Sequence, residues 1–355
     1  MIKVLVVDDS ALMRKHLGQI LEEAGFKVCM ARNGLEALQE LHRFQPDVIS
    51  LDINMPDMDG LTALSRIMVE RPTPVVMVSS LTEKGAMATF EALALGAVDY
   101  LCKPGGTISL NIHQLQDEIV AKLKTAANAR IRKTRGLAER IREENRLANV
   151  DKRPATTAVR RVALGDGLVV IGVSTGGPRT LEDILPLLPG DFPWPVVIAQ
   201  HMPANFTGAF AARMNNLCRL QVAEVTRPLL VAPGTIYIGR GGADVLMSAR
   251  KSGIHVVTAP ENHQYLWHPS VELLMLSALE HYRASQLIGV MLTGMGYDGA
   301  EAMTELHRRG GRTIAESEET AVVYGMPAEL VDRGGASLVL PVQQIATQLI
   351  GWLSR

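Results

Sequence analysis

The feature that most constrains this chain is a repeated alternation between short runs of β-branched residues and longer segments with helical periodicity. In the N-terminal part, apolar runs and helical segments follow one another at residues 4–7, 12–24, 35–44, 48–51 and 75–78. Strands that alternate with helices form βαβ units and a parallel sheet. Gly25 would end the first helix and Asn33-Gly34 would mark the turn into the second, because these residues tolerate a positive φ.

The same alternation restarts after residue 167. Buried strands are expected at residues 168–173, 196–199 and 287–292, with helices near residues 178–188 and 270–282. The closely spaced segments 235–239, 245–249 and 254–258 are expected to form a small antiparallel excursion. A chain of 355 residues is long enough for two domains. We therefore predict an α/β protein with two doubly wound parallel-sheet domains.

A basic segment separates the two predicted domains. Residues 122–153 hold eleven lysines and arginines against four acidic residues. We interpret the segment as a solvated helical extension that runs into a flexible linker, with an arm that binds nucleic acid or a protein partner as the alternative. The formal net charge of the whole chain is only -1, which argues against a protein that coats nucleic acid.

The composition also bears on the cellular compartment. Cys29, Cys102 and Cys218 are scattered and form no CxxC pair, so neither a disulfide framework nor a zinc ribbon is expected. The first nine residues do not resemble a signal peptide. A long uncharged stretch, residues 192–212, contains prolines and polar residues that disfavour a bilayer helix. These features predict a soluble cytoplasmic protein without membrane insertion.

Polar residues follow the predicted strands of the first domain. Asp8 and Asp9 end the first strand, Asp52 ends the third, Ser79 the fourth and Lys103 the fifth. The carboxyl ends of parallel strands share one edge, where open α/β folds bind ligands. Crowded carboxylates need a neutralising cation, and oxygen ligands favour a hard ion such as Mg²⁺. Beside such an ion, Asp52 could attack a phosphoryl donor.

With Lys103-Pro104 and the loop from Asn54 to Gly60, residues 3–104 resemble the receiver domain of two-component response regulators, which is flavodoxin-like. The resemblance implies that Asp52 is the phosphoacceptor and that a histidine kinase supplies the phosphoryl group. It also implies roles for further residues: Mg²⁺ binding by Asp8, Asp9, Asp52 and the backbone carbonyl of Asn54, and switching by Ser79, Tyr100 and Lys103.

The second domain contains candidates for a serine hydrolase. Ser174 lies in a glycine-rich turn between a predicted strand and a helix that begins near Pro178, which fits either a nucleophile elbow or a phosphate-binding turn. His201 directly follows another strand, where it could act as the base. Asp298 follows the strand 287–292 and could orient the imidazole. The order Ser, His, Asp differs from that of the α/β-hydrolases, which argues for convergent chemistry on another doubly wound sheet.

Several stretches of the second domain are similar to the catalytic domain of chemotaxis protein-glutamate methylesterases, the response regulators that remove methyl groups from receptors. The stretches are residues 171–178, 200–203, 233–238, 268–272, 292–300 and 322–327. The resemblance implies a Rossmann-like esterase with Ser174, His201 and Asp298 as its triad and with Thr175 and Met295 supporting the oxyanion. It implies no cofactor for the ester hydrolysis.

The resemblance predicts three segments: a receiver at 1–122, a basic linker at 123–165 and a methylesterase domain at 166–355. The expected reaction is phosphorylation-regulated hydrolysis of glutamate γ-methyl esters, with glutamine deamidation, on the cytoplasmic domains of methylated chemoreceptors. The alternative is a regulator that hydrolyses another protein ester, or binds DNA or protein, in a non-chemotactic pathway. The sequence departs from the family pattern at Tyr297, Trp267-His268 and Gly239-Arg240, which bears on substrate preference.

Overall fold

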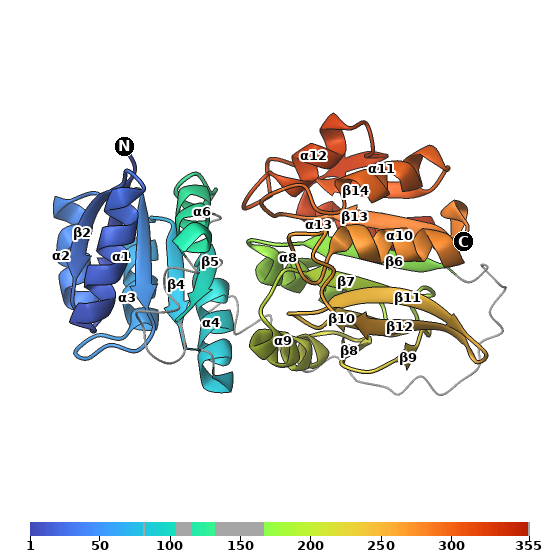
Figure 1. The fold of residues 1–355 in the computed structure, drawn as a ribbon, viewed down its shortest axis with the longest axis horizontal. Helices are drawn as coiled ribbons and strands as arrows, with labels where there is room; N and C mark the ends of the chain where they lie inside the picture. The colour runs from blue at the N-terminus through green and yellow to red at the C-terminus, as the bar shows by residue number, and fades with distance from the viewer. Residues whose placement is uncertain (81, 104–115, 132–166, 354–355) are drawn as a thin grey trace. The chain divides into compact units, whose positions relative to one another are not determined.

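The computed structural model describes residues 1–80, 82–103, 116–131 and 167–353. The chain forms two compact units, Met1–Leu137 and Ala138–Arg355, each with its own sheet. The ribbon runs from blue at the N-terminus to red at the C-terminus (Figure 1). Most of the basic linker predicted at 123–165 lies outside the described residues.

The first unit is built on a five-stranded parallel sheet with strand order β2-β1-β3-β4-β5. Its strands are β1 (Lys3–Val7), β2 (Lys27–Ala31), β3 (Val48–Asp52), β4 (Val75–Ser79) and β5 (Asp99–Cys102). Its helices are α1 (Ala11–Glu23), α2 (Gly34–Arg43), α3 (Gly60–Glu70), α4 (Glu83–Leu95) and α6 (Gln116–Ala127). Helix α1 packs beside α6, whereas α2, α3 and α4 form a separate row. The predicted doubly wound sheet is confirmed.

Local capping explains where the helices of this unit begin. The side chains of Ser10, Asn33 and Asp59 each accept a hydrogen bond from a backbone N–H in the first turn of the helix that follows. Gly25 has the positive φ expected after α1. The expectation of a positive φ at Asn33-Gly34 is wrong. Asn33 is extended (φ -158°), because its side chain accepts from the N–H of Glu36 and caps α2.

The second unit contains a seven-stranded parallel sheet with strand order β15-β14-β13-β6-β7-β10-β8. The strands are β6 (Leu168–Val173), β7 (Val196–Gln200), β8 (Gln221–Val225), β10 (Thr235–Gly239), β13 (Leu287–Met291), β14 (Arg312–Glu316) and β15 (Leu338–Leu340). The helices are α8 (Gly177–Ile184), α9 (Ala204–Leu217), α10 (Val271–His281), α11 (Ala300–Arg308), α12 (Met326–Asp332) and α13 (Val342–Leu353). Helices α10, α11 and α12 pack in one row and α9, α8 and α13 in another. This sheet is therefore also doubly wound, as predicted.

A three-stranded antiparallel sheet accompanies the parallel one. It consists of β9 (Leu229–Leu230), β12 (Gly253–Ala259) and β11 (Asp244–Arg250). The prediction that residues 235–239 belong to this excursion is wrong, because they form β10 and pair in parallel with β7 and β8. The physical reason is burial: Ile236, Tyr237 and Ile238 are all buried, as in a strand covered on both faces.

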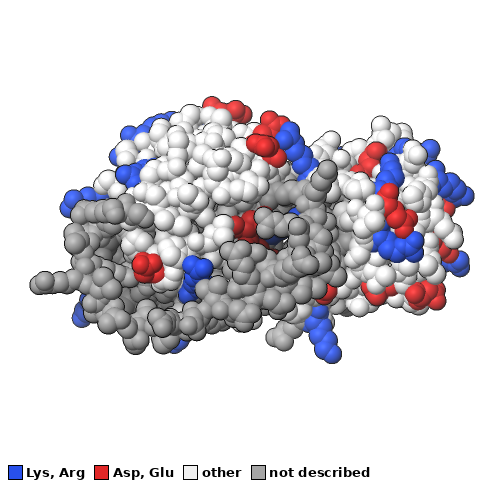
Figure 2. Space-filling model, turned by 180° about the vertical axis from the view of Figure 1, so that it is seen from behind, with Lys and Arg blue, Asp and Glu red and all other residues white. Residues whose placement is uncertain are grey.

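The order of the second sheet determines where its functional residues meet. Strand β6 lies between β13 and β7, so the turns that follow these three strands lie at one edge of the sheet. Within the described part of the chain, no helix combines the length and the apolar character needed to cross a membrane. On the face shown in Figure 2, lysines and arginines are interspersed with acidic residues over the described surface.

Candidate functional site

An acidic cluster lies at the carboxyl edge of the first sheet. Asp8 and Asp9 follow β1 and Asp52 ends β3, and one carboxylate oxygen from each lies within 4.8 Å of the others. Asp8 and Asp52 are only 1% and 2% exposed, whereas Asp9 is exposed. The structure therefore brings together the three carboxylates that the strand ends predicted.

Lys103 supplies the positive charge at this cluster. Its Nζ lies 2.7 Å from Oδ2 of Asp52 and 3.0 Å from Oδ2 of Asp8. Burial raises the pKa of Asp52 in spite of Lys103, and the ion pairs raise the pKa of Lys103 in spite of its own burial. One ammonium group thus faces two buried carboxylates and a third nearby. A set of only oxygen donors with surplus negative charge fits a hard divalent cation such as Mg²⁺.

The other predicted receiver residues lie in or just after strands β3, β4 and β5. The backbone N–H of Asn54 lies 3.4 Å from Oδ1 of Asp52. Ser79 ends β4 and donates its hydroxyl to the carbonyl of Gly85 at 3.1 Å. Tyr100 lies in β5 with its ring buried, and burial raises the pKa of its phenol well above the usual value. Ser79 and Tyr100 thus lie on the two strands β4 and β5, on one side of Asp52 in the sheet order.

Ser174, His201 and Asp298 follow the three central strands of the second sheet. Val173 pairs with Gln200 in the parallel register, so Ser174 and His201 are the next residues of neighbouring strands. The N–H of His201 also donates to the carbonyl of Val173 at 3.1 Å. On the other side of β6, the N–H of Ser174 donates to the carbonyl of Thr293 at 2.9 Å. These backbone bonds bring the serine turn close to both neighbouring turns.

Asp298 is the most heavily hydrogen-bonded member of the three. Its Oδ2 accepts from Nε2 of His201 at 2.8 Å and from the N–H of Val271 at 2.6 Å. Its Oδ1 accepts from the hydroxyl of Ser270 and the N–H of Glu272, both at 3.0 Å. Burial opposes the charge, but the bonds from His201 and the backbone outweigh burial and lower the pKa of Asp298. The carboxylate is thus held ionised at the N-terminus of α10, where the helix dipole favours it.

His201 uses only one of its ring nitrogens. Nε2 is bonded to Asp298, whereas the buried Nδ1 has no hydrogen-bond partner among the described residues. Ser174 follows the neighbouring strand, but its hydroxyl is not bonded to the imidazole. Because Asp298 accepts at Nε2, the remaining nitrogen carries a lone pair that can accept a proton. Asp298 thus holds Nε2, and Nδ1 is the ring nitrogen that is available to accept a proton.

The turns after β6 and β13 are tied together through Thr293. Its hydroxyl donates to the carbonyl of Thr175 at 2.8 Å and accepts from the N–H of Val323 at 2.9 Å. A Cβ added to Gly294 would lie 2.7 Å from Cβ of Ser174, so glycine permits this close approach. Thr175 and Met295 each adjoin one of these tied residues, Ser174 and Gly294. The two predicted oxyanion residues therefore lie in turns that contact each other.

The sequence analysis did not predict the contacts of four residues that support this site. Ser270 bonds Asp298 through its hydroxyl, and its N–H donates to Oδ1 of the buried Asp244 at 3.0 Å. The same oxygen of Asp244 lies 2.9 Å from Nδ1 of His268. Trp267 stacks on His201 with a centroid distance of 5.7 Å and an interplanar angle of 2°. The sequence signals were the family-like stretch 268–272 and the departure from the family pattern at Trp267-His268, and neither indicates these partners.

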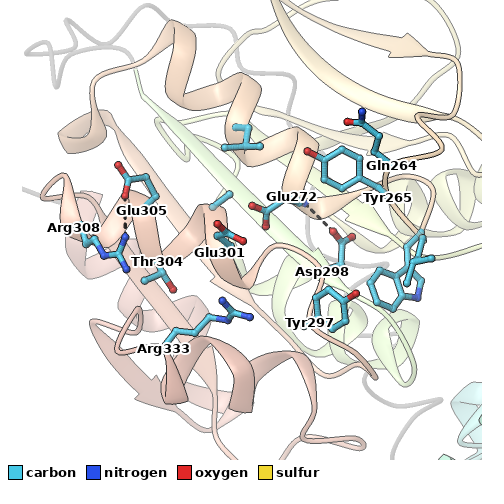
Figure 3. A pocket seen from close by; sticks show the side chains of 14 residues that line it. Gln264, Tyr265, Glu272, Tyr297, Asp298, Glu301, Thr304, Glu305, Arg308 and Arg333 are labelled. Atoms are coloured by element: carbon cyan, nitrogen blue, oxygen red, sulfur yellow. Dashed lines mark hydrogen bonds and ion pairs between the residues drawn. The ribbon is translucent and has the colours of Figure 1, made fainter.

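A pocket of about 630 Å³ adjoins Asp298. Its walls come from the loop 264–267 and from α10 and α11, and Tyr297, Asp298, Glu272 and Arg333 are among the residues that line it (Figure 3). Burial raises the pKa of Glu272 to about 6, and the charges of Asp298 and Glu301 add to this effect. The pocket therefore combines aromatic walls with groups of both charges.

Comparison with known proteins agrees with this geometry. The sequence model of the CheB methylesterase family matches residues 169–349, and that of the response regulator receiver domain matches residues 4–113. A protein of Rhodospirillum rubrum named protein-glutamate methylesterase/protein-glutamine glutaminase 3 is 57% identical over 100% of this chain and 97% of its own length. A protein of Rhodopseudomonas palustris that bears the same name with the number 2 is 55% identical over 99% and 98%.

A solved structure of a CheB methylesterase catalytic domain is similar to the second unit. The CheB methylesterase catalytic domain of Thermotoga maritima is 38% identical and matches with a TM-score of 0.51, covering 53% of this chain and 100% of that domain. The two family matches span both compact units. With its receiver domain and its catalytic domain, the chain belongs to the family of CheB methylesterases.

Proposed function

We propose that this protein is a phosphorylation-regulated serine hydrolase that demethylates glutamate γ-methyl esters on the cytoplasmic domains of chemoreceptors. The observation that carries the proposal is the bond from His201 to the buried carboxylate of Asp298, with Ser174 at the end of the adjacent strand. The names of the relatives in Rhodospirillum rubrum and Rhodopseudomonas palustris support the glutamate ester as the substrate.

The geometry supports an acyl-enzyme mechanism. Oγ of Ser174 attacks the ester carbonyl carbon while Nδ1 of His201 takes the hydroxyl proton, and Asp298 stabilises the imidazolium that forms. The carbon–methoxy bond then breaks, and methanol leaves with the proton from His201. Water, deprotonated in turn by His201, cleaves the acyl-enzyme and releases the free glutamate carboxylate.

The developing oxyanion needs hydrogen-bond donors from the protein. We assign them to the turns of Thr175 and Met295, since these turns are tied to each other beside Ser174 through Thr293. Donors of this kind contribute about 3 kcal/mol each to transition-state stabilisation. Glutamine deamidation needs the same acyl-enzyme, with ammonia as the leaving group instead of methanol, so one site serves both reactions.

The receiver unit supplies the regulation. We assign Asp52 as the phosphoacceptor, with a histidine kinase as the donor. Asp8, Asp9, Asp52 and the carbonyl of Asn54 would hold Mg²⁺, which when bound supplies positive charge beside the phosphoryl group. Lys103 already bonds Asp52 and would stay with the phosphoryl oxygens. Ser79 and Tyr100 would respond to the new charge, Ser79 by exchanging its bond to Gly85 for one to the phosphate.

The test is methanol release from a methylated receptor fragment, with and without Mg²⁺ and a small-molecule phosphodonor. We expect release that rises with the phosphodonor and that is lost in Ser174→Ala. The matched control is Ser252→Ala, which removes an exposed serine hydroxyl from the turn between β11 and β12, outside the candidate triad. A Ser174→Ala protein with full activity, or a phosphorylated wild type that releases no methanol, would contradict the proposal.

A further inference from the structure

Trp267 has a position that neither the family resemblance nor the reaction explains. Its indole lies parallel to the imidazole of His201, with an interplanar angle of 2° and a centroid distance of 5.7 Å. Offset parallel rings at this distance attract each other. The same indole lines the pocket beside Asp298.

His201 needs such a support. One hydrogen bond, from Nε2 to Asp298, holds the ring, and Nδ1 has no hydrogen-bond partner within the described ranges. A ring attached through its Cβ and one hydrogen bond can still tilt about the line that joins them. An indole ring stacked on one face restricts this tilt, and it keeps Nδ1 in the plane in which it can accept the proton of Ser174.

The indole is itself held from two sides. The glycine that precedes Tyr297, Gly296, has φ of +89°, and a Cβ added there would lie 2.7 Å from the indole, so the backbone touches the ring. The ring of Tyr297 meets the indole edge-on, at 86° and 5.2 Å between centroids. The next residue of the loop, His268, is anchored to the buried Asp244 at 2.9 Å.

Tyr297 forms the outer part of this support. Its side chain is 53% exposed and lies at the pocket beside Asp298 (Figure 3). Gly296 and Tyr297 directly precede Asp298 in the chain, so the segment that carries the triad carboxylate also packs against the indole. Asp298 holds the imidazole edge and Trp267 holds its face, and the two are linked through Gly296 and Tyr297.

We propose that Trp267 is a positioning residue for the reaction, which fixes the plane of the His201 imidazole so that Nδ1 can accept the proton of Ser174, and that Tyr297 keeps the indole in place. This inference rests on the proposed function, because it assumes that Ser174 and His201 react together. Trp267 itself need not contact the reacting atoms.

The experiment separates alignment of the triad from binding of the receptor. Trp267→Leu, Trp267→Phe and Tyr297→Ala are compared in the full-length protein, with Trp352→Leu as the matched control on α13. Two rates are measured: sulfonylation of Ser174 by phenylmethanesulfonyl fluoride, which is too small to need the receptor-binding surface, and methanol release from the methylated receptor fragment. Thermal unfolding confirms that each variant is folded.

We expect Trp267→Leu to lower the sulfonylation rate and kcat for methanol release by the same factor, on the order of 10-fold to 100-fold, with KM unchanged. Trp267→Phe should restore most of both rates, since a phenyl ring still stacks. Tyr297→Ala should show a smaller loss of both, and Trp352→Leu none. A rise in KM with an unchanged sulfonylation rate would overturn the proposal and make Trp267 a receptor contact.

The same two rates, measured for the wild type, test the proposed function separately from the role of Trp267. If wild-type Ser174 is sulfonylated but no methanol is released, the proposed substrate is wrong and the sulfonylation rates still decide the role of Trp267. If wild-type Ser174 is not sulfonylated at all, both the nucleophile assignment and the inference about Trp267 are overturned.

Discussion

The hydroxyl of Ser270 donates to Oδ1 of Asp298 at 3.0 Å, although the two residues lie 28 positions apart in the chain. Ser270 is also the N-cap of α10, where its oxygen accepts from the N–H of Leu273 at 3.3 Å. One hydroxyl therefore starts the helix and supports the acid of the candidate triad. The position of Asp298 depends on where α10 begins, which couples a feature of folding to the reaction geometry.

Ser270→Ala should affect stability and activity together. Loss of an N-cap side chain destabilises a protein by about 1 kcal/mol, and Asp298 also loses one of its four donors. We expect a lower free energy of unfolding in urea and a lower kcat for methanol release. Ser270→Thr keeps the hydroxyl and should recover both. A variant with lower stability but unaltered kcat would show that the bond to Asp298 has no functional role.

Asp298→Asn tests the orienting acid with little change in shape. Asparagine can no longer stabilise the imidazolium, and its amide group can present a donor to His201 where the carboxylate accepts. In a Ser-His-Asp triad this change lowers kcat by about 10⁴-fold. We expect a loss of similar size in methanol release. A fall of less than about 10-fold would contradict the role that we assign to Asp298.

Asp298 should also make the stability of the wild-type protein depend on pH. Hydrogen bonds lower the pKa of Asp298 in the folded protein, so the unfolded chain binds the proton more readily. The stabilisation is therefore present above the usual carboxyl pKa of about 4 and is lost as the pH falls through the lower folded value. We expect the melting temperature of the wild type to decline more steeply below pH 4 than that of Asp298→Asn. Equal slopes for the two proteins would contradict this prediction.

Sequence patterns predicted the residues at strand ends well, for a physical reason. Parallel strands end at one edge of a sheet, so residues that follow separate strands, such as Asp8 and Asp52 or Ser174 and His201, must meet there. The structure brings these pairs together as expected. Their roles in phosphorylation and hydrolysis remain predictions, since proximity alone does not establish a reaction.

The residues that sequence patterns did not predict depend on contacts between distant segments. The stacking of Trp267 on His201 joins a loop to a strand end 66 positions away, and no local periodicity encodes it. Strand β10 was misplaced because its neighbours β11 and β12 are close in sequence, whereas its partners β7 and β8 are set by burial on both faces. Asn33 was misread because a cap and a left-handed turn favour the same residue type.

Glu272 should affect the pH dependence of stability in the opposite direction to Asp298. Burial raises its pKa to about 6 in the folded protein, so the folded state binds the proton more readily than the unfolded chain. The protonated form favours folding below the usual carboxyl pKa, and this advantage is lost as the pH rises to about 6. We expect Glu272→Gln to gain melting temperature relative to the wild type between pH 4.5 and pH 8. The control is Glu280→Gln at the other end of α10, where no such trend is expected.

Asp52→Ala tests the regulation in the receiver unit. The change removes the carboxylate that would accept the phosphoryl group. Burial raises the pKa of this carboxyl group, which means that its charge is unfavourable where it lies, so the unit should stay folded without it. We expect basal methanol release to persist and stimulation by Mg²⁺ and a phosphodonor to disappear. Chelation of Mg²⁺ should also abolish stimulation in the wild type, because only Lys103 then offsets the charge of the three clustered carboxylates. Glu22→Ala, which removes an exposed acid on α1, should leave stimulation intact. Continued stimulation of Asp52→Ala would mean that the phosphodonor acts elsewhere on the chain.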